Sequence, residues 1–273
     1  MAGLVLHTIL LVPFFSWKFT HAAHHGATNH LRKDQVFVPP NRAEAVIDRH
    51  WYDSLEDAPL WNLFFAFRMF VLGWPAYLLL NTSGQAADGF SSHFLPKSKI
   101  FKPTQRIWVS LSNWALVGMV GLLSIWINRL GFVHFATRYG LPYLFVNAWL
   151  IFYTFMQHTD LKLPHYEAKE WNFVRGALAT IDRPYHMFDF FHHEIGTSHV
   201  LHHFFSRIPH YHAAEATQAI KGVLKEYYNY DDRNVFAAFW QEYVNCKFVD
   251  ADAGASDGIL WFKRSFKQIE KSK

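Results

Sequence analysis

The sequence predicts an all-α fold, a membrane-embedded bundle of helices with a polar helical cap that is rich in histidine. Two observations carry this prediction. Apolar runs alternate with polar, histidine-rich stretches, although 51% of the 273 residues are hydrophobic overall. One uncharged run also reaches the roughly 20 residues that a membrane-spanning helix needs. The average composition therefore describes two phases, one suited to lipid and one suited to water.

Two apolar runs in the middle of the chain form the clearest spans. Residues 107–127 carry no charge over the length of a bilayer crossing. Residues 131–157 follow after a short connection, and the charge of Arg138 within them can extend to an interface. We expect these two runs to cross as an antiparallel pair.

Two further apolar runs are less regular. Residues 2–17 resemble the apolar part of a signal peptide, but no basic region precedes them, and we expect a third span here. Residues 60–80 have sufficient length but contain Arg68, Gly73 and Pro75. Such interruptions suit an interfacial or re-entrant helix, which is the placement that we expect for this run.

The two histidine-rich regions, residues 21–30 and 192–212, lie on either side of the predicted pair of spans. Two crossings return the chain to the side on which it began, so both regions can face one compartment. Lys18 flanks the first region and Lys162 follows the last span. The tendency of basic residues to remain in the cytosol places both regions there.

Charge and cysteine content exclude other classes of protein. The net charge is +4, but lysine and arginine are scattered and the aromatic residues lie mainly inside apolar runs. This distribution does not suit a nucleic-acid-binding protein. Cys246 is the only cysteine, which excludes an internal disulfide and a zinc ribbon with paired cysteines.

Two segments share a histidine spacing, His21-Ala-Ala-His24-His25 and His199-Val-Leu-His202-His203. On a helix, positions i, i+3 and i+4 lie on one face, so each segment presents three imidazoles together. At this histidine content, chance gives about 0.08 matches to such a pattern in the whole chain. The repetition therefore indicates a shared function.

Six imidazoles predict a site for two metal ions. Neutral imidazole suits Fe, Zn, Cu and Ni, whereas Mg and Ca call for carboxylates, which these segments lack. Six also exceed the number of ligands that one zinc ion takes. Iron, unlike zinc, changes its valence and activates dioxygen, and an iron centre at a membrane surface predicts oxidation of a lipid chain.

With these two histidine segments, the sequence resembles the membrane fatty acid desaturases. The two segments stand in WKFTHAAHHGATNH and EIGTSHVLHHFFSRIPHYHAAEATQAI, and they are similar to the second and third histidine boxes of that family. Further similar motifs are DQVFVP at Asp34–Pro39, QHTD at Gln157–Asp160, LPHY at Leu163–Tyr166 and RGALATIDRPY at Arg175–Tyr185. The resemblance covers nearly the whole chain as a single domain, and it is strongest to the methyl-end class of delta-12 and omega-3 enzymes in their fungal or oomycete forms.

The resemblance assigns metal-binding roles to seven histidines. These are the six box residues and one histidine after a span: His21, His24, His25, His158, His199, His202 and His203. It also suggests residues that orient these ligands through hydrogen bonds: His192, His193, Glu194, Asp34 and Asp182.

The resemblance further implies an oxidoreductase with two iron ions and O2 as co-substrate, which introduces a cis double bond into a fatty acyl lipid or acyl-CoA. No HPGG haem motif is present, so cytochrome b5 and its reductase are the implied external electron donors. The implied location is the endoplasmic reticulum membrane, with the boxes facing the cytosol. Hydroxylases and acetylenases of the same family share these boxes and form the alternative.

One part of the family pattern is missing. The family has a first box of the form His-x-x-x-His before the second, and here only His7 precedes His21. The resemblance therefore implies that the chain begins within the family's second membrane helix and is truncated. A further alternative follows, in which the chain as it stands is a non-catalytic, metal-binding membrane protein.

Overall fold

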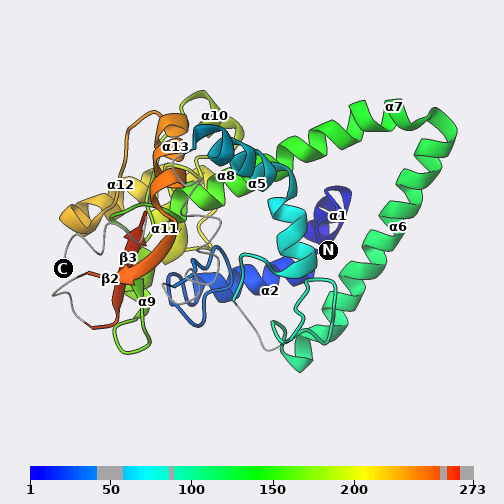
Figure 1. Ribbon diagram of the computed structural model, residues 1–273. Helices are drawn as coiled ribbons and strands as arrows, with labels where there is room; N and C mark the ends of the chain where they lie inside the picture. Colours follow the sequence, from blue (N-terminus) through cyan, green and yellow to red (C-terminus); the bar gives the residue numbers. More distant parts are fainter. Residues whose placement is uncertain (42–57, 86–88, 253–256, 265–273) are drawn as a thin grey trace. The chain divides into compact units, whose positions relative to one another are not determined.

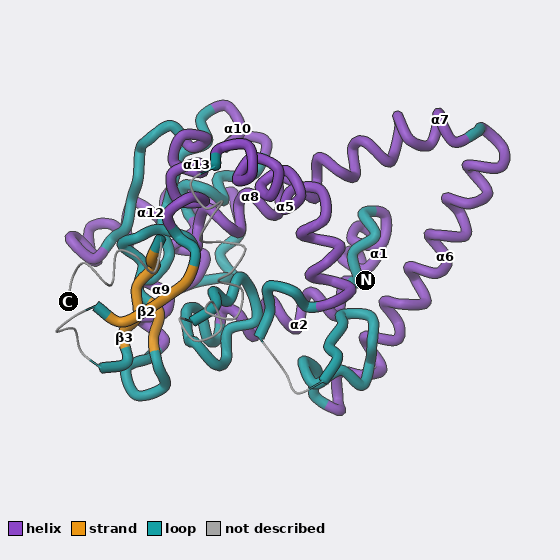
Figure 2. The backbone as a smooth tube through the Cα atoms, in the orientation of Figure 1, coloured by secondary structure: helices purple, strands orange, loops and turns teal. Residues whose placement is uncertain are grey.

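The computed structural model describes residues 1–41, 58–85, 89–252 and 257–264 (Figure 1). The chain divides into two compact units. The first unit contains Met1–His24 and Phe67–Phe152, and the second contains His25–Ala66 and Tyr153–Lys273. Helices prevail in the described residues, and the strands belong to the second unit (Figure 2). The predicted helical class is confirmed.

Helix α6 (Arg106–Leu130) is the longest element of the first unit. Its buried residues Val109, Ser112, Leu116 and Leu123 form one stripe, and α1 (Ala2–Ile9) packs against this helix. Most of its remaining surface is exposed yet apolar, for example at Trp114. A helix that is apolar on all sides is suited to lipid rather than water.

Two helices in the described residues are long and apolar enough to cross a membrane. They are α5 (Pro59–Leu80) and the segment Pro103–Leu130, which joins the short helix η1 (Pro103–Gln105) to α6. A third candidate is a bent pair, α1 and α2 (Phe14–His25), whose axes differ by 103°. By length and composition, residues 60–80 could therefore cross a membrane. The interfacial placement that we expect for them is still a prediction.

The chain reverses at Gly131, whose φ of 86° lies in the region that favours glycine. Helix α7 (Phe132–Phe135), the π-helix η2 (Ala136–Gly140) and α8 (Leu141–His158) then follow without a break. This continuous helical segment corresponds to the predicted run 131–157. Its last residue is His158, one of the expected metal ligands.

The second unit consists of short helices around a small sheet. The helices are α9 (Phe173–Leu178), α10 (Met187–Phe191), α11 (His199–Phe204), α12 (Ala213–Leu224) and α13 (Val235–Asn245), with the short 3-10 helices η3 (His210–His212) and η4 (Lys225–Tyr227). The strands are β1 (His165–Tyr166), β2 (Phe248–Ala251) and β3 (Ile259–Lys263), antiparallel in the order β1-β3-β2. The sheet was not predicted, because strands of two to five residues leave no alternating pattern long enough to recognise.

The sheet holds the segment that follows α2. Leu31 N donates to the carbonyl of Tyr166 at 3.0 Å, and Tyr166 N donates to the carbonyl of Asn29 at 2.9 Å. Leu31 also packs in a core cluster with Val249 and Phe262 from the two neighbouring strands. The chain is therefore anchored shortly after the histidine box His21–His25.

Burial of His165 predicts acid sensitivity of this unit. Burial lowers the pKa of His165 to about 4, and its ring lies edge-on to Phe262 at 4.9 Å. The unfolded chain takes up this proton below pH 6.5 while the folded chain does not, so stability falls as the pH drops from 6.5 toward 4. We expect His165→Phe to recover about 2 kcal/mol of the stability that the protein loses between pH 7 and pH 5. Thermal unfolding in detergent across this range measures the effect, and identical pH profiles would contradict the assignment.

Candidate metal centre

Helix α2 presents the histidine box His21–His25. Residues Phe14–His25 form a regular helix, so His21, His24 and His25 share one face as expected. The ring centroids of His21 and His24 are 6.0 Å apart, and the His21 ring packs on Trp17 one turn earlier at 4.7 Å. The helix ends at His25. A few residues later, Asn29 and Leu31 form hydrogen bonds with Tyr166 of strand β1.

The histidine box His199–His203 lies in α11, a helix of six residues in the second unit. His199 and His203 lie one turn apart, with their Nε2 atoms at 3.1 Å. The Nε2 atom of His158, at the end of α8, lies 3.0 Å from that of His199. All three rings are buried, with at most 8% of each residue exposed. Three imidazole nitrogens thus meet at one point inside the protein.

The separation of these nitrogens fits a shared metal ion. Imidazole ligands bind metal ions such as zinc at about 2.0–2.1 Å, so two of them on adjacent coordination positions stand about 3 Å apart. The distances of 3.0 and 3.1 Å between the Nε2 atoms match this requirement. Imidazole donors without carboxylates also favour a transition metal over magnesium or calcium. The residues present therefore fit a metal site.

Two further histidines extend this cluster within the second unit. The His25 ring stacks on that of His203 at 4.3 Å and meets that of His202 edge-on at 4.4 Å. One ring nitrogen of His25 and one of His202 lie within 4.8 Å of each other. Five of the seven predicted histidines, taken from α2, α8 and α11, are thus brought together in this unit. His21 and His24 precede His25 on α2 and belong to the first unit.

Thr28 contributes to the site but was not predicted. Its hydroxyl lies 3.0 Å from His203 Nδ1, and the residue is 1% exposed. Such a contact fixes the tautomer and ring orientation of a metal-binding histidine and leaves Nε2 for the metal. Trp171 Nε1 in turn donates to the carbonyl of Thr28 at 2.9 Å. No spacing rule connects Thr28 to His203 across 175 residues of sequence.

Asp182, an expected orienting residue, lies at the start of α11. Its Oδ1 accepts from Val200 N at 2.8 Å, and its Oδ2 accepts from the hydroxyl of Tyr228. Burial raises the pKa of Asp182 to about 6, while these hydrogen bonds act in the opposite direction. The carboxylate therefore holds the backbone of the histidine-bearing helix.

Asp34 holds the turn after α2 in a similar way. Its two oxygens accept from Asn29 N at 2.7 Å and Val36 N at 3.1 Å. The residue is 4% exposed, so these bonds form away from water. Its action on a metal-binding histidine stays a prediction.

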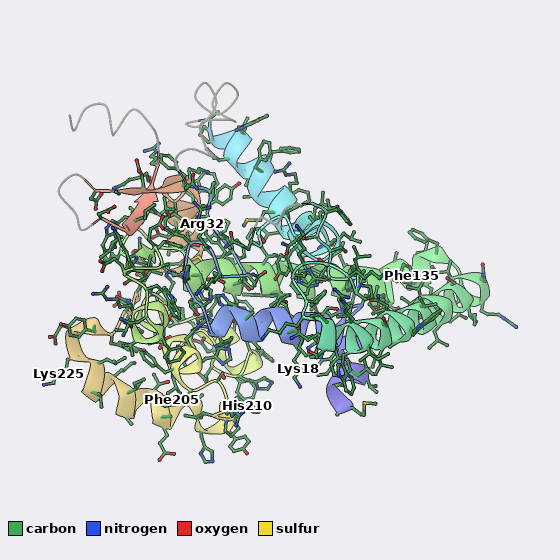
Figure 3. The ribbon with its side chains drawn as sticks, turned by 90° about the horizontal axis from the view of Figure 1, so that it is seen from below. Lys18, Arg32, Phe135, Phe205, His210 and Lys225 are labelled. Atoms are coloured by element: carbon green, nitrogen blue, oxygen red, sulfur yellow. The ribbon has the colours of Figure 1, made fainter. Side chains whose placement is uncertain are left out.

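The remaining predicted orienting residues lie in the loop before α11. His192 Nδ1 contacts the carbonyl of Phe188 at 2.9 Å, and Glu194 Oε2 accepts from the Thr197 hydroxyl at 2.9 Å. The ring of His193 packs against that of His210 at 4.3 Å, and His210 stands at the exposed start of η3 (Figure 3). These contacts order the loop, and an effect of the three residues on metal ligands stays a prediction.

Comparison with known proteins decides the family. A family model described as fatty acid desaturase matches residues 1–234. The endoplasmic reticulum isozyme 1 of omega-6 fatty acid desaturase from Glycine max is 40% identical over 267 residues, covering 97% of this chain and 68% of the relative. The chain belongs to the fatty acid desaturase family. Its members are oxidoreductases, and the predicted enzyme class is confirmed.

Other relatives of this desaturase carry related names. A delta(12)-fatty-acid desaturase from Arabidopsis thaliana is 40% identical over 261 residues, covering 95% of this chain and 67% of the relative. A delta(12) fatty acid desaturase from the fungus Mortierella isabellina is 42% identical over 275 residues, covering 96% and 68%. The predicted resemblance to delta-12 desaturases, fungal ones included, is confirmed.

The contact between Thr28 and His203 generates a prediction for this desaturase. Thr28→Val keeps the shape of the side chain but removes the hydroxyl, so we expect metal retention to fall about tenfold or more. Thr217→Val is the matched control, because Thr217 is equally buried but lies in α12. Metal retained after dialysis against a chelator distinguishes the variants, and equal losses in both would contradict a role for Thr28.

Proposed function

We propose that this desaturase introduces a cis double bond at the delta-12 position of an oleoyl chain, in a reaction that uses O2. The meeting of the Nε2 atoms of His158, His199 and His203 at one buried point is the observation that carries the proposal. The names of the relatives support delta-12 rather than omega-3 selectivity.

We assign two iron ions to the histidine cluster. The proposed ligands are the seven histidines predicted from the sequence: His21, His24, His25, His158, His199, His202 and His203. Iron supplies a valence change and reactivity toward dioxygen, which the removal of two hydrogens from unactivated methylenes requires. The helical spacing of α2 supports the inclusion of His21 and His24, because it places them on the face of His25.

The chain's own residues orient the ligands and position the substrate. Thr28 holds the His203 ring through Nδ1, and Asp182 holds the start of α11. The methylenes of an acyl chain are chemically alike, so only the position in which the chain is held can select one bond. An apolar cavity of about 220 Å³ in the first unit, lined by residues such as Leu78 and Leu116, provides a surface suited to part of that chain.

We place the enzyme in the endoplasmic reticulum membrane with the histidine boxes facing the cytosol. The Glycine max relative is named as an endoplasmic reticulum isozyme, which supports this compartment, and the two apolar helices support a membrane location. Cytochrome b5 and its reductase are the proposed electron donors, with basic residues near the cytosolic face attracting an acidic partner.

Expression in a yeast that makes oleate but no linoleate tests the proposal. The protein and its His203→Ala variant, the inactive control, are expressed in parallel. We expect linoleoyl lipids to accumulate in cells that express the unaltered protein and to be absent from cells that express His203→Ala. A hydroxylated oleoyl product without a second double bond, or no new product, would contradict delta-12 desaturation.

A further inference from the structure

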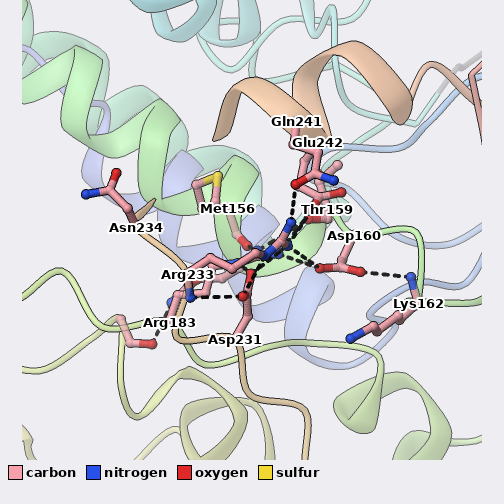
Figure 4. A network of polar contacts seen from close by, with 12 residues as sticks. Met156, Thr159, Asp160, Lys162, Arg183, Asp231, Arg233, Asn234, Gln241 and Glu242 are labelled. Atoms are coloured by element: carbon pink, nitrogen blue, oxygen red, sulfur yellow. Dashed lines mark hydrogen bonds and ion pairs between the residues drawn. The ribbon is translucent and has the colours of Figure 1, made fainter. Parts of the chain in front are cut away.

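Arg183 lies fully buried beside the end of the helix that carries His158. Its exposed fraction is 0%, and its guanidinium contacts the carbonyl of Met156 and, at 3.3 Å, the carbonyl of Thr159 (Figure 4). The same group pairs with Asp160 at 2.6 Å and with Asp231 at 2.9 Å. One side chain therefore contacts the chain on both sides of His158.

These contacts satisfy the open end of α8. The last four carbonyls of a helix have no partner within the helix and need donors from elsewhere. Here Ile181 N donates to the carbonyl of Gln157 at 3.2 Å, and Arg183 donates to that of Met156. The segment 181–183 thus fixes the last turn of α8, which presents the His158 ring.

The neighbouring residue fixes the other ligand-bearing helix. Asp182 accepts from Val200 N, next to His199, while Arg183 N donates to the carbonyl of Gly196 at 2.8 Å. Gln157 Nε2 donates to the same carbonyl at 2.7 Å. The Asp182 side chain therefore contacts the start of α11, and the Arg183 side chain contacts the end of α8.

We propose that Asp182 and Arg183 form a clamp that sets the separation of His158 and His199, with Arg183 as a positioning residue for His158. The two residues are adjacent in sequence, and the Nε2 atoms of the two histidines lie 3.0 Å apart. Because buried hydrogen bonds tie each helix end to the same short segment, a displacement of either end would break bonds that are costly to lose. The clamp rests on the proposed function, in which both histidines bind metal.

The acidic residues around Arg183 offer a competing explanation. Asp160, Asp231 and Glu242 surround the guanidinium, and burial of one unpaired charge among them would destabilise the fold. Hydrogen bonds from Arg233 and Arg183 lower the pKa of Asp231, although burial alone would raise it. Arg183 could therefore act only by neutralising these carboxylates.

Arg233 separates the two explanations. It pairs with Asp231 at 2.7 Å, with Glu242 at 2.7 Å and with Asp160 at 3.6 Å, so it contacts the same three carboxylates. Its remaining described contact is with the side chain of Gln241 rather than with the end of α8. A change at Arg233 thus disturbs the charges without removing a donor from the carbonyls beside His158.

The decisive comparison uses Arg183→Lys and Arg233→Lys in the full chain. Lysine keeps the positive charge but lacks the planar fork that reaches several acceptors at once. Each purified protein is freed of metal and titrated with Co2+, whose visible absorption reports ligand number and geometry. The thermal unfolding midpoint of each metal-free protein is measured in parallel.

We expect Arg183→Lys to bind Co2+ about tenfold or more weakly and with an altered spectrum, whereas Arg233→Lys remains within about twofold of the wild type. The two metal-free midpoints should agree within a few degrees. Equal Co2+ affinities in all three proteins would overturn the clamp, as would equal weakening in both variants. A wild-type protein that binds no Co2+ would instead refute the metal centre of the proposed function.

Discussion

The arrangement depends on the meeting of imidazoles that lie far apart in the sequence. His158 and His199 are separated by 41 residues, yet their Nε2 atoms lie 3.0 Å apart in a buried site. Polar ring nitrogens removed from water must find partners, and a metal ion satisfies several of them at once. For this to occur, the ends of α2, α8 and α11 have to keep fixed positions relative to one another. The small sheet and the polar loops of the second unit hold these helix ends in place.

Buried polar groups of the second unit also hold the helices that carry the histidines. Asp182 and Arg183 are both fully buried, and each has hydrogen-bonding partners on a different segment of the chain. A buried charge is costly unless it is paired and hydrogen-bonded, and this cost is compensated by the carboxylates and helix-end carbonyls around Arg183. The interior near the histidines is thus ordered by directional bonds, whereas three of the four buried residues of α6 in the first unit are apolar.

Local features of the fold could be predicted from the sequence, and long-range contacts could not. The spacing of His21, His24 and His25 specifies a helix face without reference to the rest of the chain, and α2 has that form. Thr28 and Arg183 act through contacts 175 and 27 residues away, respectively, so no local pattern points to them. Asp231 lies in a run of polar residues, and no local pattern indicates that it pairs with the buried Arg183. The family motifs identified Asp182, although only the structure shows which backbone group it holds.

The most direct test of this account is the iron content of the purified chain. Metal analysis against an accurate protein concentration should give two iron ions per chain, and His199→Ala should reduce that number while His212→Ala should not. His212 serves as the comparison because its exposed side chain lies outside the buried cluster. Iron that stays well below two per chain, or zinc in its place, would contradict a histidine-ligated di-iron centre.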